Sequence, residues 1–144
     1  MVTVNTQPGI ATLLANMVAN FDFTTIEVGL FTNDISLNYG VLLTDLTEAD
    51  YTGYAKKPLV ETGNAIVTGQ SGDTLINFPH LTFAPTAPVL VANTIWGWFS
   101  VGDYNDDAPV LLEVHKFDEA FTIATILDIL IVEPRIIIGQ PRGN

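Results

Sequence analysis

The chain has 144 residues, 48% of them hydrophobic, which fits one folded domain and excludes an intrinsically disordered chain. Its 16 acidic residues against 5 Lys and Arg give a formal net charge of -11, so no basic face can form, and we expect neither nucleic acid nor a membrane surface as a partner. The sequence holds no cysteine, which excludes disulfides, thiolate metal sites and a Cys nucleophile.

The first expected element is a helix within residues 1–20. Thr6 can cap it, Pro8 suits its first turn, and Asn20 is a suitable end. Its apolar side chains recur at the spacing of one helical face: Ile10, Leu13, Leu14, Met17 and Val18. A helix with one apolar stripe packs on its own sheet or docks on a neighbour. We therefore predict a helical arm whose contacts to a partner are Ile10, Leu13, Leu14 and Met17.

Residues 25–31 begin a pattern with a period of two, which is typical of strands with one buried face. Ile26, Val28 and Leu30 point one way, and the side chains between them point the other. A single helical turn is expected at residues 44–50, and further strands are expected at 55–60, 65–68 and 74–78. The prolines of residues 79–88 limit that segment to an edge strand or an irregular crossing.

Residues 94–101 form the next expected strand, with Ile95, Phe99 and Val101 on one face and Trp96 and Trp98 on the other. The two tryptophans are either core residues or, if one face is open, an aromatic platform for a partner, because Trp concentrates binding energy at interface centres. The core is the favoured interpretation. Trp96 and Trp98 also join the candidate partner contacts.

The remaining segments complete a mostly β chain. A strand is expected at 110–117, and residues 126–132 are apolar on both faces apart from Asp128, which is typical of a central strand. Residues 136–138 continue that strand or form a final one. About seven to nine strands predict an antiparallel β-sandwich or barrel with one N-terminal α-helix. We expect one domain over residues 1–144, with the arm at 1–20, the β domain at 21–139 and a loose tail at 140–144.

Glu113 and His115 share one face of the strand expected at 110–117. They could be an acid–base pair or the start of a metal site. We interpret them as a polar surface face opposite the buried Leu112 and Val114, because a site needs converging third and fourth groups. His80 has no local partner in the sequence.

The remaining acidic clusters give no stronger signal. Residues 103–107 (DYNDD) resemble the opening of a calcium loop, but Ala108 and Val114 stand where its glycine and its bidentate glutamate belong. Asp45, Glu48 and Asp50 lie on a polar turn, where solvated carboxylates are far commoner than a glycosidase pair. We therefore predict no catalytic residues, no cofactor and no metal.

Five segments, in their order along the chain, are more specific than any single motif. They are residues 28–34 (VGLFTND), 43–55 (LTDLTEADYTGYA), 94–99 (TIWGWF), 111–117 (LLEVHKF) and 131–136 (IVEPRI). This order resembles a family of small, mostly uncharacterised bacteriophage proteins, and the likeness spans most of the chain after the expected helix. The chain departs from the family at Val114 and Lys116, where members carry a tryptophan and an arginine, so the details of any contact do not transfer.

The resemblance implies a virion component without an active site: a capsid decoration (cement) protein on the outside of the head lattice. Such a protein is made in the host bacterial cytoplasm and located at the capsid surface, and its partners are the major capsid protein and further copies of itself, as a dimer or trimer. A tail, fibre or baseplate component is the alternative, and a phage-encoded hydrolase or lectin is a third. The mean hydropathy of +0.35 agrees with a chain that covers part of its apolar surface by association.

Overall fold

The computed structural model describes residues 2–5, 26–59, 65–68, 74–102 and 108–138. These residues form strands β1 to β10 and one 3₁₀ turn, η2 (Leu43–Asp45), and they contain no α-helix. The expected mostly β class is confirmed. The predicted helix falls on residues outside the described part. Among the described residues, no helix is long and apolar enough to cross a membrane.

One sheet has five antiparallel strands in the order β1-β8-β7-β2-β3. Its middle is formed by the longest strands, β7 (Asn93–Gly102) and β8 (Val110–Ile123). β2 (Ile26–Phe31) lies beside β7, and the short β3 (Lys57–Pro58) follows at one edge. β1 (Val2–Asn5) pairs with β8 at the other edge, so the prediction of an arm over residues 1–20 is wrong for its first residues. A strand of 4 residues is too short to show a sequence pattern.

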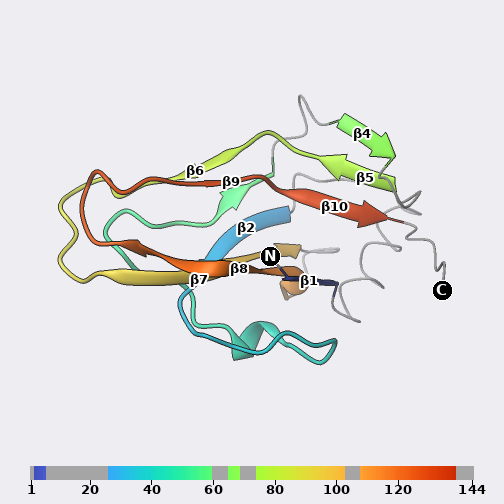
Figure 1. The fold of residues 1–144 in the computed structure, drawn as a ribbon, viewed down its shortest axis with the longest axis horizontal. Coiled ribbons are helices and arrows are strands. Elements are labelled where there is room, and N and C mark those ends of the chain that lie inside the picture. Colours follow the sequence, from blue (N-terminus) through green and yellow to red (C-terminus); the bar gives the residue numbers. More distant parts are fainter. Residues whose placement is uncertain (1, 6–25, 60–64, 69–73, 103–107, 139–144) are drawn as a thin grey trace.

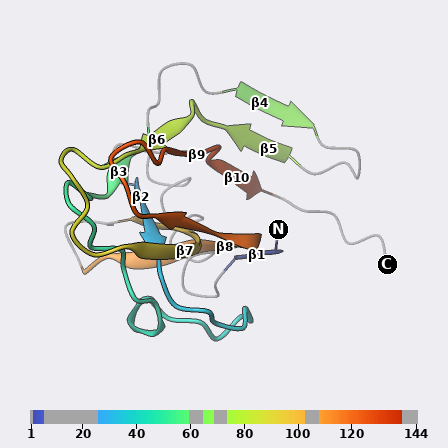
Figure 2. The same ribbon diagram turned by 60° about the vertical axis from the view of Figure 1, so that its left-hand side comes forward.

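The remaining strands lie across one face of this sheet as a second layer (Figures 1 and 2). β10 (Arg135–Ile138), β5 (Thr74–Asn77) and β4 (Ala65–Thr68) form one antiparallel group, and β6 (Leu81–Phe83) pairs with β9 (Leu130–Val132). Phe78 N donates a hydrogen bond to Pro134 O at 3.0 Å between these two groups. The paired strands therefore run on past the interruption, where Pro79 and Pro134 cannot donate to the ladder.

Two hydrophobic cores lie on opposite faces of the five-stranded sheet. The larger core fills the space toward the second layer, and its most buried members are Ile26, Val28, Leu30, Phe83, Ile95, Trp98, Leu112, Ile123 and Val132. The smaller core lies under residues 32–46 and contains Phe31, Val41, Phe99, Val101, Leu111 and Val114. Because both faces are covered, β7 carries buried side chains on both sides along most of its length, and β8 does so over residues 111–115.

The predicted faces of β7 are wrong only beyond Trp96. Ile95 lies in the larger core and Trp96 packs against the smaller core, so these two are on opposite faces as predicted. The register of β7 on β8 shifts between Ile95 and Gly97, so strict alternation breaks there. Trp98 therefore shares the larger core with Ile95, and Phe99 lies in the smaller core with Trp96.

The predicted central strand at 126–132 is also wrong for most of its length. Only its last residues are in β9, and the side chain of Leu127 is 83% exposed. The cause is Asp128, whose Oδ2 accepts hydrogen bonds from the N–H groups of Ala124 and Thr125 at 2.8 and 2.7 Å. These bonds fold residues 124–128 into a turn instead of a strand.

β7 and β8 approach each other closely at Gly97. A Cβ atom there would lie 1.9 Å from His115 O and 2.7 Å from the ring of Phe31. Glycine is required here by space, since the carbonyl belongs to the neighbouring backbone and cannot move without breaking the ladder.

We expect Gly97→Ala to lower the free energy of unfolding by about 3 kcal/mol or more, because an added methyl group must push apart two paired strands. Equilibrium urea unfolding measures this. Gly40→Ala is the matched control, since a Cβ there would meet only the side chain of Asn38 at 3.1 Å. The explanation fails if the two variants unfold at the same urea concentration.

Candidate functional site

Glu113 and His115 lie inside the protein, on the face of β8 that looks toward the second layer. Their side chains are 1% and 0% exposed, and His115 Nε2 is 2.9 Å from Glu113 Oε2. The interpretation of these residues as a polar surface face is therefore wrong. The alternation of polar and apolar residues predicted one exposed face, but both faces of β8 are covered at these residues.

The imidazole of His115 is stacked on the indole of Trp98. The ring centroids are 3.7 Å apart, the planes differ by 12°, and the two residues are register partners on β7 and β8. Ser100 is the register partner of Glu113 and is also buried. Glu113 Oε1 is buried without a hydrogen-bond partner in the described residues.

A hydrogen-bonded carboxylate and imidazole are the groups that general acid–base catalysis uses. Catalysis also requires that they reach a substrate, and these two are closed off by the sheet and the core around Trp98. The arrangement is suited to holding β8 in its register. A buried carboxylate that lost its imidazole would be left without compensation for its desolvation.

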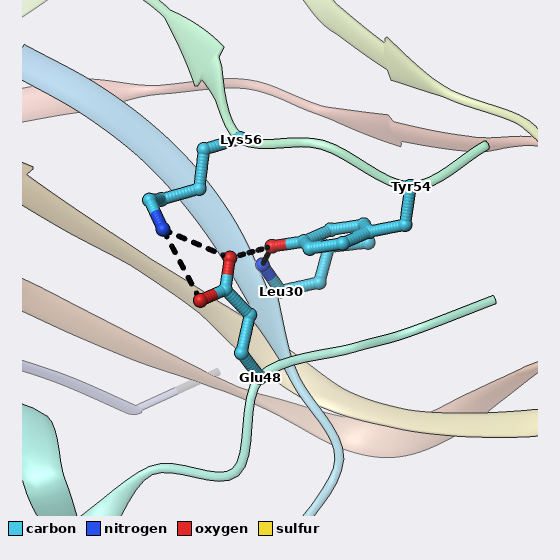
Figure 3. Close-up of polar contacts among 4 residues, drawn as sticks. All are labelled: Leu30, Glu48, Tyr54 and Lys56. Atoms are coloured by element: carbon cyan, nitrogen blue, oxygen red, sulfur yellow. Dashed lines mark hydrogen bonds and ion pairs between the residues drawn. The ribbon is translucent and has the colours of Figure 1, made fainter. Parts of the chain in front are cut away.

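A second polar cluster closes the edge of β2 beyond the end of β3 (Figure 3). The Tyr54 hydroxyl accepts a hydrogen bond from Leu30 N at 3.0 Å and donates one to Glu48 Oε1 at 2.8 Å. Lys56 Nζ donates to both carboxylate oxygens of Glu48, at 3.1 and 3.2 Å. Ala49 N donates to Leu30 O at 2.9 Å, so both backbone groups of Leu30 are satisfied without a further strand.

Burial governs the titration of the two tyrosines at this edge. It raises the pKa of Tyr51 from 10.0 to about 12. Burial also raises the pKa of Tyr54. The hydrogen bond from Leu30 N lowers this pKa, and the Glu48 carboxylate raises it further. The Tyr54 hydroxyl therefore keeps its proton across the physiological range and remains a donor to Glu48.

A small pocket of about 130 Å³ adjoins this cluster. It is lined by Leu43, Leu46, Glu48, Lys56, Phe99, Val101 and Pro109. Pockets for cofactors and drug-sized ligands start at roughly 300 Å³, so this one has room for no more than a single side chain. It does not supply a cofactor site.

Each lysine of the described part contacts an acidic or an aromatic side chain. Lys56 pairs with Glu48, and Lys57 lies 5.6 Å above the ring of Phe83. Lys116 pairs with Asp34, donates to Ile35 O at 2.9 Å, and lies 5.5 Å from the ring of Trp96. These contacts do not bring the lysines together into a basic surface.

The other sequence candidates are dispersed. His80 lies 3.3 Å from Glu133 on the surface, both largely exposed. Trp98 is 3% exposed, in agreement with the favoured core interpretation, and Trp96 is partly exposed. The residues described contain no group of three or more His, Asp or Glu side chains able to hold a metal. Outside the described part lie the calcium-like loop 103–107 and the predicted helical contacts Ile10, Leu13, Leu14 and Met17.

The feature that the sequence analysis missed is a group of exposed apolar side chains on the neighbouring connections 84–92 and 124–129 and on β9. Among the described residues the exposed large hydrophobic side chains are Tyr39 and Leu42, and the six that we call the apolar end: Leu90, Val91, Ile126, Leu127, Ile129 and Ile131. The six lie on two connections, 84–92 from β6 to β7 and 124–129 from β8 to β9, and on β9 itself. These connections lie together at the left of Figure 1, because β6 pairs with β9 and β7 pairs with β8.

Thr125 and Asp128 carry the sequence signal that could have revealed this feature. A Thr followed three residues later by an acid is a capping pattern, in which each side chain bonds the other's backbone region. The Thr125 hydroxyl accepts from Leu127 N at 3.2 Å, and Asp128 accepts from Thr125 N. The pattern predicts a turn, and a turn places the apolar side chains at its tip in water.

Comparison of the chain with protein-family models, with curated proteins and with solved structures gave no match.

The Glu113–His115 contact predicts that a single variant at this pair loses more stability than the double variant. His115→Phe keeps a ring against Trp98 but leaves the Glu113 carboxylate buried alone, and we expect it to cost about 3–5 kcal/mol of unfolding free energy. Adding Glu113→Leu removes the uncompensated group, so the double variant should recover more than half of that loss. Urea unfolding of the two variants and the native chain measures both values. A double variant no more stable than His115→Phe would contradict the structural role.

The Tyr54 hydroxyl is expected to stabilise the edge of β2. Tyr54→Phe removes the acceptor for Leu30 N and a donor to Glu48, and we expect a loss of about 1–3 kcal/mol in thermal or chemical unfolding. Tyr39→Phe is the control: this ring is 67% exposed, and its change should stay within about 0.5 kcal/mol. Equal stability of the two variants would show that the hydroxyl of Tyr54 does not stabilise the edge of β2.

Proposed function

We propose that this protein is a structural component of a bacteriophage particle, a capsid decoration protein that binds the outside of the head lattice and stabilises it. It acts by binding protein surfaces and not by catalysis. The observation that carries the proposal is the apolar end, because exposed apolar patches on a compact domain mark sites of protein association.

Three further features support this function. The order of segments from residue 28 to residue 136 resembles small bacteriophage proteins. The two packed layers of antiparallel strands fit a β-sandwich, a compact architecture common among surface and capsid proteins. The Glu113–His115 pair, the strongest candidate for chemistry, is buried away from any substrate.

Many copies on one lattice would give strong attachment from weak individual contacts. In this mechanism two or three copies associate and bridge junctions between subunits of the major capsid protein. Within the N-terminal segment 1–20, residues 2–5 pair with β8 of the same chain, so the proposed arm toward a neighbour is limited to residues 6–20. The partly exposed Trp96 is a further candidate contact. Such a lattice of contacts would stiffen the shell against internal pressure.

The apolar end also favours this proposal over an enzyme or a lectin. A sugar-binding site needs polar groups around its aromatic or apolar surfaces, whereas the side chains exposed at the apolar end are Leu, Val and Ile. A tail, fibre or baseplate component remains the second candidate, since it would use the same kind of surface for assembly.

The copy number in purified virions tests the proposal. A decoration protein should be present at a copy number near that of the major capsid protein, as a strong band on a denaturing gel and by quantitative mass spectrometry. A tail component would be present at tens of copies or fewer. Absence of the protein from washed particles that are otherwise complete would overturn a virion role.

A further inference from the structure

We draw no further inference here: the strongest candidate, the apolar end on connections 84–92 and 124–129 and on β9, supports none, because nothing in the structure shows what covers these exposed side chains.

Discussion

The pairing of β7 with β8 is the constraint on which the rest of this structure depends. These strands approach so closely at Gly97 that a Cβ there would lie 1.9 Å from His115 O. The two register shifts between these strands determine which side chains enter each core. The connections 84–92 and 124–129 of the apolar end join the strands at the end where Asn93 pairs with Ile123. A change in their pairing would alter both cores and the exposed surface together.

The same pairing explains the buried polar pair. With cores on both faces of the sheet, any polar side chain near the middle of β8 must find its partner inside the protein. Glu113 and His115 do so through one hydrogen bond, and Trp98 covers the imidazole. This buried pair is suited to holding β8 in its register. Among the described residues, the Glu113–His115 pair is in the interior, whereas the apolar end is on the surface.

Sequence patterns predicted most of the strands, because alternation and β-branched composition are local properties. The strand at 65–68 and the start of the strand at 110–117 agree with the structure. β2 ends where predicted, and β7 is one residue longer than predicted at each end. The faces of Trp98 and Phe99 relative to Ile95 could not be predicted, since a register shift depends on the partner strand. The burial of Glu113 and His115 could not be predicted either, because a second covered face is a tertiary property. Asp128 was visible in the sequence, but its apolar neighbours outweighed it.

The central claim is that the pairing of β7 with β8 determines the rest of the fold, and cysteine cross-linking tests that register directly. Thr94 and Thr122 are exposed register partners on the two strands, and the chain has no native cysteine. Because paired residues of antiparallel strands lie within disulfide reach, Thr94→Cys with Thr122→Cys should form an intramolecular disulfide on mild oxidation, whereas Thr94→Cys with Glu119→Cys should not. Cross-linking of the second pair and not of the first, measured by mass spectrometry of the intact chain, would contradict the account.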